Sequence, residues 1–364
     1  MKIEFIATCN KGLEEIAALE VSMLINQKAQ KIRGGMIKFE GNLDDIFILN
    51  YFSKTLHKIY YVLLEDYFSS LNDIYSKIKS SIDFTQYIYP TQTFAIVANR
   101  IGNHNFTSLD VARVAGQAVI DSYLEKKNIR LKVNLDNPNI SILVDVMNDK
   151  FFVALDTTGK SLHARWYRKC SHISPLKPTV AASMILLSNY NKEFSLIDPF
   201  CGIGTIPIEA YHLINRVPNL NRSFEFEKFY FLDRNKWLDM LKYRGKDEKL
   251  KIYGSDINEN YIECAKENSK EAYTKIEFFV EDALNIDYSN YDFVITDLPY
   301  GIRKKYENLE ELYKNFINRV LNSNIKKFLV ITARWKLVEK FANIKSKYFA
   351  DYRSLTAAIL EIDV

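Results

Sequence analysis

Two short stretches of the sequence combine residue types that suit chemistry. The first is Asp-Pro-Phe-Cys-Gly-Ile-Gly-Thr from Asp198 to Thr205, and the second is Asp297-Leu-Pro-Tyr-Gly. Gly202 and Gly204 let the backbone turn tightly after an apolar strand and approach a ligand without a Cβ in the way. Thr205 then opens a helix, whose first N–H groups are free to bind a carboxylate or phosphate. The first stretch therefore predicts a small-molecule site.

Two common nucleotide motifs do not fit this turn. Pro207 stands where a Gly-x-Gly-x-x-Gly fingerprint has its third glycine, which counts against an ordinary dinucleotide site. The stretch also lacks the Gly-Lys-Ser/Thr of a phosphate-binding P-loop. We therefore expect a cofactor that contains a nucleoside but is bound by neither of these two motifs.

Carboxylates at the ends of the next two strands predict how a nucleoside would be held. Asp256 can accept both ribose hydroxyls, although a surface Asp that caps the following helix is the alternative. Asp282 can accept the amino group of adenine while the Ala283 N–H reaches a ring nitrogen. The predicted cofactor site comprises Asp198, Phe200, Gly202, Gly204, Thr205, Asp256, Ile257, Asp282, Ala283 and Asp297.

Asp297-Leu-Pro-Tyr suits reaction at an exocyclic amine of a base. Such an amine is a poor nucleophile, because its lone pair is delocalised into the ring. The Asp297 carboxylate and the Leu298 carbonyl can accept its two hydrogens and localise that lone pair. Pro299 keeps these acceptors aimed, and Tyr300 offers a face for the flipped base. A buried structural turn is the alternative.

The elements around these motifs predict an α/β protein with three parts. Residues 1–60 form a ferredoxin-like α+β unit, with strands at 3–7, 36–39 and 58–64 and helices at 13–24 and 43–53. Residues 61–162 form a second α+β unit, with helices at 70–82 and 107–127, the latter starting at Thr107, and strands at 92–99, 140–147 and 150–156.

Residues 177–364 alternate strands and helices, which is typical of a doubly wound, Rossmann-like sheet. We expect strands at 194–198, 251–255, 276–280, 291–296, 326–332 and 355–362, and helices at 178–189, 204–215, 258–270, 308–322 and 335–342. Residues 216–250 interrupt the alternation. This insertion is interpreted either as a local lid or as a segment that only packs against the rest of the protein.

A basic linker over 163–176 joins the halves and extends to Lys177. Its positive charges, among them Arg165 and Arg168, are interleaved with Trp166 and Tyr167, a pattern typical of nucleic-acid contact. A solvated linker is the alternative. Arg100 and His104 flank Gly102 on a predicted loop, where they could contact phosphate.

Composition excludes several classes of protein. The 49 Lys and Arg residues nearly balance the 45 Asp and Glu, so any RNA affinity must come from local clusters. The four cysteines, Cys9, Cys170, Cys201 and Cys264, show no CxxC pairing and predict neither a disulfide framework nor a zinc site. No signal segment or long apolar run is present in the sequence. We expect a cytoplasmic monomer with no metal and no membrane contact.

Longer segments resemble known families. Phe94 to Ser108, with Val111, Gly116 and the stretch 133–140, resembles the THUMP RNA-binding domain. Residues 162–168 and Pro175-Leu-Lys177 resemble the Leu-His-x-Arg-Gly-Tyr-Arg and Pro-Leu-Lys signatures that join THUMP to a methyltransferase domain, with Trp166 in place of the glycine. Asp297-Leu-Pro-Tyr is similar to the Asp/Asn-x-Pro-Tyr motif of amino-group methyltransferases, with Leu298 where many relatives have proline.

The resemblance implies a THUMP-containing tRNA guanine-N2 methyltransferase that uses S-adenosylmethionine, with tRNA position 6 as the target. Arg303 would hold a phosphate or the base. Cys201 would be a packing residue, since a nucleophilic cysteine marks carbon-5 methylation of pyrimidines. Position 10 of tRNA, a ribosomal RNA guanine and a catalytically silent RNA-binding protein remain as alternatives. DNA adenine methylation shares the motif, but the THUMP-like half argues against it.

Overall fold

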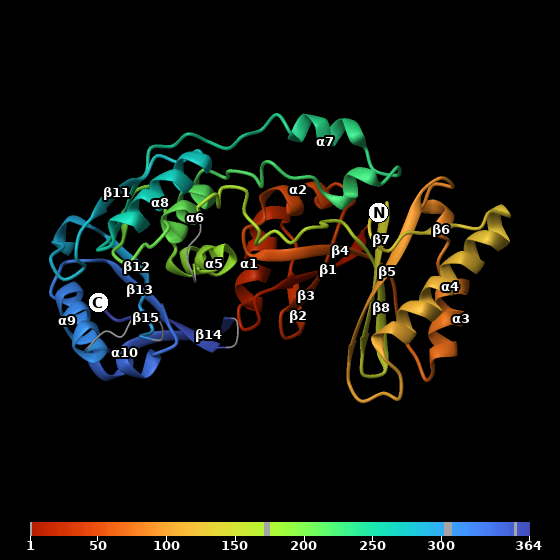
Figure 1. Cartoon of the computed structure of the whole chain (residues 1–364), viewed down its shortest axis with the longest axis horizontal. Helices are drawn as coiled ribbons and strands as arrows, with labels where there is room; N and C mark the ends of the chain where they lie inside the picture. Colours follow the sequence, from red (N-terminus) through yellow and green to blue (C-terminus); the bar gives the residue numbers. More distant parts are fainter. Residues whose placement is uncertain (1, 171–174, 302–307, 353–354) are drawn as a thin grey trace.

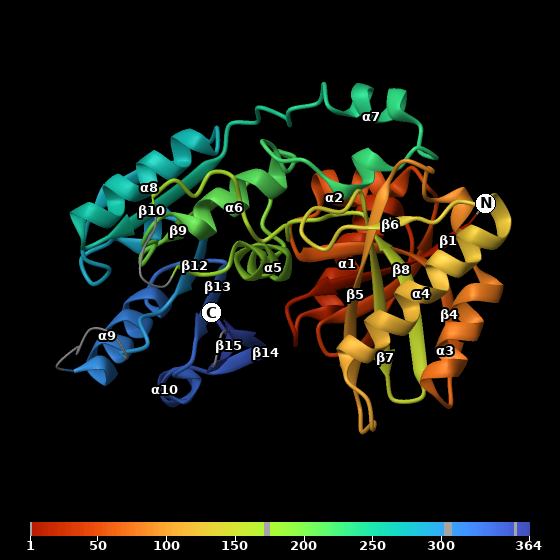
Figure 2. The same ribbon diagram turned by 45° about the vertical axis from the view of Figure 1, so that its right-hand side comes forward.

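Two β-sheets, one in each half of the chain, organise the protein (Figure 1). The computed structural model describes residues 2–170, 175–301, 308–352 and 355–364. The N-terminal half and the C-terminal half lie side by side, and the chain crosses between them in the linker and again in the segment that carries α7 (Figures 1 and 2).

The N-terminal sheet has eight strands in the order β2-β3-β1-β4-β8-β7-β5-β6. β4 pairs with β1 on one side and with β8 on the other, so the two α+β units predicted for this half share one continuous sheet. A short edge strand, β2, had not been predicted. The strands are β1 (Ile3–Cys9), β2 (Ala29–Arg33), β3 (Met36–Gly41), β4 (Leu56–Tyr67), β5 (Thr93–Ile101), β6 (Lys132–Val133), β7 (Ile140–Met147) and β8 (Lys150–Asp156).

The helices of this half pack on one face of that sheet. Alternate strand residues, such as Phe5 and Ala7, face the helices, while Ile6 faces the other side. α4 begins at the predicted place with a capping box, because the Thr107 side chain accepts from the Asp110 N–H and the Asp110 carboxylate accepts from the Thr107 N–H. The helices are α1 (Glu14–Ile25), α2 (Asp45–Phe52), α3 (Leu71–Ser81) and α4 (Ser108–Lys127).

The C-terminal sheet confirms the expected doubly wound architecture. Its order is β11-β10-β9-β12-β13-β15-β14, and the strands from β11 to β13 are parallel. The chain runs outward from β9 in both directions, which places a ligand crevice between the carboxyl ends of β9 and β12. The strands are β9 (Ser195–Asp198), β10 (Lys251–Asp256), β11 (Glu277–Val280), β12 (Phe293–Asp297), β13 (Lys327–Thr332), β14 (Ile344–Tyr352), which had not been predicted, and β15 (Leu355–Ile362).

Helices cover both faces of this sheet. On β12, Ile295 packs in one apolar cluster with Val180 and Ile206, while Val294 packs in the other with Phe316. Burial on both faces explains why the strand reads as a continuous apolar run. The helices are α5 (Pro178–Ser188), α6 (Thr205–Ile214), α8 (Glu259–Glu271), α9 (Leu309–Leu321) and α10 (Trp335–Phe341).

The insertion over 216–250 packs against the N-terminal half. Figures 1 and 2 show it leave the C-terminal half, run over the other half with α7 (Arg234–Met240) and return. Its aromatic side chains join the N-terminal core, with the rings of Phe226 and Trp237 centred 5.3 and 5.9 Å from that of Phe47 on α2. The buried aromatic members are Phe224, Phe226, Phe229 and Trp237.

A second contact between the halves lies at the edge strand β14. Lys11 forms an ion pair with Asp351 at 2.9 Å, and its carbonyl accepts from the Asp351 N–H. The next residue, Gly12, has a positive φ of 92°, and a Cβ there would stand 1.8 Å from the Phe349 carbonyl oxygen. Glycine is therefore required where β14 meets the loop after β1. Within the described residues, no helix has the length and apolar character needed to cross a membrane.

Candidate active site

The two glycines of the predicted turn have different roles. Both have positive φ, 52° for Gly202 and 82° for Gly204. A Cβ on Gly204 would lie 3.0 Å from the Phe278 ring and 3.2 Å from Ala265, whereas a Cβ on Gly202 would meet nothing within 4 Å. Gly204 therefore allows α6 to pack closely, and Gly202 faces open space that a ligand could fill.

Asp256 holds the turn against β10. Its half-buried carboxylate accepts from the Gly202 N–H at 3.1 Å and from the Asn258 N–H at 2.9 Å. Asn258 itself caps α8. Asp256 is therefore not the cap of this helix, and its contact with the Gly202 N–H puts the carboxylate beside the turn, where the ribose prediction needs it.

The predicted adenine contacts lie around the ends of β10 and β11. Ile257 is 63% exposed, and Val280, which we had not predicted, is 49% exposed beside it. Asp282 accepts from the Leu284 N–H, and the carbonyl of the buried Ala283 accepts from the Tyr288 hydroxyl. Two exposed apolar side chains at neighbouring strand ends could enclose a flat ring between them. Sequence reasoning missed Val280 because the sequence does not reveal that its side chain is exposed.

Asp198 joins the ends of β9 and β12. It is 1% exposed, and its Oδ1 accepts from the Thr296 hydroxyl at 2.6 Å and the Phe200 N–H at 3.2 Å. Burial raises the pKa of Asp198 to about 8, and the nearby carboxylates of Asp297 and Asp256 add to the rise. The Phe200 ring meanwhile packs edge-on against Phe316.

Asp297 differs from Asp198 in its hydrogen bonding. Its Oδ1 is buried and has no hydrogen-bond partner within the described part of the chain. Burial raises the pKa of Asp297 to about 7, and a hydrogen bond between its carboxylate and the Tyr300 side chain offsets part of the rise. A buried acceptor without a donor is costly, so this oxygen suits a ligand that brings an N–H group.

The loop 297–300 is held from three sides. The Leu298 N–H donates to the Ile331 carbonyl at 3.0 Å, the Tyr313 hydroxyl donates to the Pro299 carbonyl at 3.0 Å, and the Arg334 Nε donates to the Tyr300 carbonyl at 3.1 Å. Sequence reasoning missed Tyr313 and Arg334, because they are 14 and 34 residues from their partners. Together these contacts fix the direction of the loop.

The expectation that Arg165 contacts RNA needs correction. Arg165 is 6% exposed, and its guanidinium donates twice to Glu209, at 2.9 and 2.8 Å, and once to the Lys54 carbonyl. Tyr167 also donates to Glu209. Although burial raises the pKa of Glu209, Arg165 lowers it to about 2. This buried ion pair stabilises the contact between the halves and leaves no guanidinium for phosphate.

The other predicted RNA contacts lie in separate places. Arg168 and Lys177 are half-buried in the linker region. Arg100 lies within β5 and not on a loop as predicted, while His104 lies on the loop that follows, with Nη1 of Arg100 3.0 Å from Nδ1 of His104. This loop belongs to the N-terminal half, apart from β9 and β12 (Figure 1). Arg303 lies outside the described residues.

The cysteine prediction was wrong in one respect. Cys170 of the linker and Cys264 of α8 form a disulfide, although 94 residues separate them. Cys201 is a buried free thiol whose pKa burial raises well above the usual value, which fits packing and not nucleophilic attack. In the described ranges, no group of three or more His, Cys, Asp or Glu side chains could hold a metal ion.

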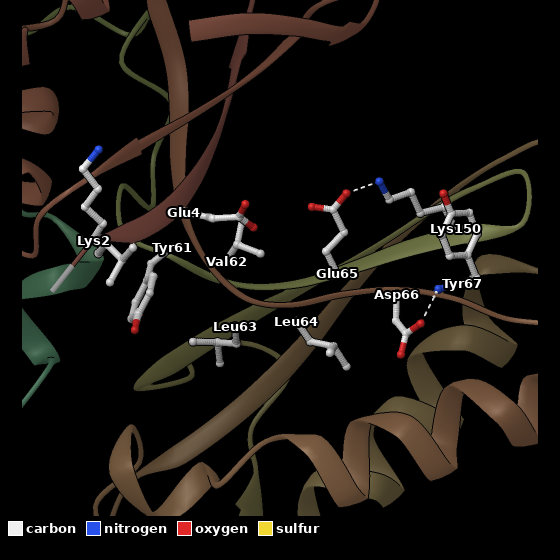
Figure 3. Close-up of a pocket in the computed structure, with 11 residues that line it drawn as sticks. Lys2, Glu4, Tyr61, Val62, Leu63, Leu64, Glu65, Asp66, Tyr67 and Lys150 are labelled. Carbon is white, nitrogen blue, oxygen red and sulfur yellow. Dashed lines mark hydrogen bonds and ion pairs between the residues drawn. The ribbon is translucent and has the colours of Figure 1, made fainter. Parts of the chain in front are cut away.

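A cavity of about 610 Å³ lies in the N-terminal half, along β4 (Figure 3). Its acidic and basic side chains pair with one another, as Glu65 does with Lys150. None of the predicted site residues lines it; the lining is Lys2, Ile3, Glu4, residues 61–67 and Lys150. The cavity is therefore separate from the crevice between β9 and β12.

Comparisons with known proteins bear on this geometry. Residues 165–353 match the RMKL-like methyltransferase domain, residues 68–156 the THUMP domain and residues 4–60 the RlmL ferredoxin-like domain. The chain is 38% identical over 350 residues to a tRNA (guanine(6)-N2)-methyltransferase of Archaeoglobus fulgidus, covering 94% of this chain and 85% of the relative. It is 37% identical to a protein of the same name from Methanocaldococcus jannaschii, with 92% of each covered.

A solved structure agrees with the whole architecture. The crystal structure of a possible methylase from Clostridium difficile 630 matches with a TM-score of 0.90 and 27% identity, covering 100% of this chain and 98% of that one. The match includes both halves. Their arrangement is therefore shared with an experimental structure.

Proposed function

The chain belongs to the RMKL-like methyltransferase family and carries its THUMP and ferredoxin-like domains, and from this premise we propose that it methylates the exocyclic N2 of a guanosine in tRNA. The two relatives with the same domain span are named for guanine-6 of tRNA, so position 6 is the proposed target and N2-methylguanosine the product.

We propose S-adenosylmethionine as the cofactor, and its sulfonium would supply the methyl group. The residues at the crevice fit such a molecule. Gly202 leaves open space beside the turn, Asp256 stands at the turn as a ribose acceptor, and Ile257 with Val280 could enclose the base. The raised pKa values of Asp198 and Asp297 also suit a site for a positively charged ligand, because a cation stabilises their ionised forms.

The loop 297–300 would prepare the guanine amine. The free Oδ1 of Asp297 can accept one N–H of the N2 group, and the Leu298 carbonyl can accept the other. These two acceptors would localise the lone pair toward the methyl group, so that the N–C bond forms as the bond from that carbon to the sulfonium breaks and neutral S-adenosylhomocysteine is left. The amine then loses one proton, which Asp297 can take, since its pKa lies near 7. Tyr300 would stack on the base.

The N-terminal half would hold the tRNA. Arg100 and His104, together with the exposed parts of Arg168 and Lys177, are the proposed backbone contacts. We also propose a monomer in the cytoplasm, where tRNA is modified. The Cys170–Cys264 disulfide is unusual for that compartment, and a mass measurement without reductant would show whether the isolated protein contains it.

One observation carries the proposal: a buried carboxylate oxygen without a donor at the end of the strand beside the glycine turn. The test is transfer of a tritiated methyl group from S-adenosylmethionine to unmodified total tRNA and to ribosomal RNA, followed by nucleoside digestion and mass analysis. N2-methylguanosine in tRNA, lost when guanosine 6 of a transcript is replaced by adenosine, is the expected result. Label in ribosomal RNA alone, or in neither RNA, would contradict the proposal.

A further inference from the structure

Asn268 of α8 contacts two segments that are distant in the sequence. Its side chain is fully buried. The Nδ2 group donates to the Ile203 carbonyl at 3.3 Å and to the Cys170 carbonyl at 3.2 Å. The Oδ1 atom accepts from the N–H groups of Lys169 and Cys170 at 3.1 and 3.2 Å. One amide therefore joins the glycine turn to the linker.

The Ile203 carbonyl is an informative partner. It belongs to the peptide group between Ile203 and Gly204, whose plane turns with ψ of Ile203 and with φ of Gly204, a glycine at +82°. Glycine restricts its own φ least, and the N–H of this peptide group donates to the Cys201 carbonyl at 2.9 Å, so Asn268 supplies a second hydrogen bond that limits rotation of the plane. The hydrogen bond from Asn268 opposes that rotation, and the N–H groups that follow it at the start of α6 keep their direction.

Two further links tie the same linker to this region. The Arg168 guanidinium donates to the Thr205 hydroxyl at 2.9 Å and also to the Leu176 carbonyl. Thr205 directly follows Gly204 and is the first residue of α6. The disulfide fastens Cys170 to Cys264, which lies one helical turn before Asn268 and faces the same way. The linker is thus bonded to Thr205, directly after the peptide that Asn268 holds, and to α8, one turn before Asn268.

We propose that Asn268 is a positioning residue for the cofactor: through it and Arg168, the linker holds the glycine turn in the conformation that binds the cofactor. This inference rests on the proposed function, because it takes the turn to be the cofactor site. It assigns the linker a role at the cofactor turn, whereas its sequence suggested RNA contact alone. Asn268 acts through the turn and not on the reacting atoms.

The first test is calorimetric binding of S-adenosylhomocysteine to the full chain without RNA, for the wild type and Asn268→Asp. Aspartate keeps the acceptor for the linker N–H groups but cannot donate to the Ile203 and Cys170 carbonyls. We expect the Kd to rise about tenfold, because only one of the two lost hydrogen bonds, the one to Ile203, holds the turn, and a buried hydrogen bond is worth roughly that factor. In turnover assays, KM for S-adenosylmethionine should rise by a similar factor while KM for tRNA stays within about twofold.

Asn215 provides a matched control. It is also fully buried, and its side chain accepts from the Glu248 N–H at 2.7 Å and donates to the Glu248 carbonyl. It joins the end of α6 to the insertion, away from the glycine turn. Asn215→Ala should lower thermal stability and leave the affinity for S-adenosylhomocysteine unchanged.

The affinities of these variants for S-adenosylhomocysteine test whether Asn268 positions the cofactor turn. Unchanged affinity in Asn268→Asp would overturn the proposal, as would an equal loss of affinity in Asn215→Ala, since the role would then be general stability. Should the Asn268 variant not fold, Arg168→Met removes the second link and should raise the Kd several-fold; no change there would overturn the proposal too. A wild type that binds no S-adenosylhomocysteine would instead refute the proposed function itself.

Discussion

Asp198 and Asp297 end neighbouring parallel strands, and burial raises the pKa of both, yet their surroundings differ. Asp198 accepts from the Thr296 hydroxyl and the Phe200 N–H, whereas Oδ1 of Asp297 has no donor among the described residues. A native protein rarely leaves a buried acceptor without a donor, because the cost is about 1–3 kcal/mol. The comparison indicates that Asp198 holds the ends of β9 and β12 together, whereas Oδ1 of Asp297 is available to a ligand.

The largest expected effect is at Asp297. Asparagine has the same shape, but its amide donates where a carboxylate oxygen accepts. Asp297→Asn should therefore lower kcat by about 10²- to 10⁴-fold, the usual contribution of a proton acceptor at the reacting group. Binding of S-adenosylhomocysteine should stay within about threefold, because the reacting amine belongs to the RNA.

A control for this variant lies at the other end of the same strand. Asp292 precedes β12 and accepts from the N–H and hydroxyl of Ser195. Asp292→Asn should leave kcat unchanged. If Asp297→Asn retains turnover at the level of Asp292→Asn, the buried Oδ1 of Asp297 has no catalytic role.

The pH dependence should follow the raised pKa of Asp297. Below about 7 its carboxyl is protonated and can no longer accept both the N–H and the departing proton. We expect kcat/KM for tRNA to fall about tenfold per pH unit below that value and to level off above it. A profile measured from pH 5.5 to 9 that stays flat through 7 would contradict this assignment.

The stability of the free protein should change in the opposite sense. Asp198 and Asp297 have an ordinary pKa of 3.8, and in the folded chain these values rise to about 8 and about 7. The folded state therefore binds these protons more tightly than the unfolded state, and their stabilising contribution is complete below 3.8. It is lost as the pH rises through 7 and 8. Urea unfolding across this range measures the trend.

Thr296→Val tests the comparison of Asp198 with Asp297 by removing a hydrogen-bond donor of Asp198. The variant keeps the shape but removes the hydroxyl that donates at 2.6 Å, so Oδ1 of Asp198 keeps the Phe200 N–H as its donor. The free energy of unfolding should fall by about 1–3 kcal/mol. The loss should be larger at pH 9, where Asp198 is ionised, than at pH 6. Equal losses at the two pH values would show that the hydroxyl does not stabilise the charged form.

The smallest effect is expected at Tyr313. Tyr313→Phe removes the hydroxyl that donates to the Pro299 carbonyl and also lies 2.7 Å from the Thr332 hydroxyl, and it should cost about 0.5–1.5 kcal/mol of stability per lost hydrogen bond, with a several-fold fall in kcat. Tyr123 is the control, because its buried hydroxyl donates to the Ile88 carbonyl in the other half. Tyr123→Phe should lose similar stability and keep kcat. Equal kcat values for the two variants would mean that Tyr313 does not position the loop.

Much of the site could be predicted because its signals are local. Gly202, Gly204 and Asp297 lie in short motifs at strand ends, and a doubly wound sheet brings such ends together. The start of α4 at Thr107 is equally local. The edge strands β2 and β14 were missed because polar residues interrupt their apolar patterns, and an edge strand has less need of burial.

The remaining features depend on partners that the local sequence does not identify. Arg165 looks like any basic linker residue until Glu209, 44 residues later, is placed beside it. Cys170 and Cys264 have no telling spacing, and Asn268 is an ordinary helix residue until the linker lies against it. Their roles come from tertiary contacts between segments that composition and periodicity treat separately.

The aromatic insertion determines how this protein can be divided. A fragment that begins at residue 177 would present Phe224, Phe226, Phe229 and Trp237 to water, and a fragment that ends at residue 162 would leave the surface they cover bare. Apolar patches of this kind favour aggregation. Gene fusions and domain exchanges should therefore move the two halves together, since neither half carries a complete surface of its own.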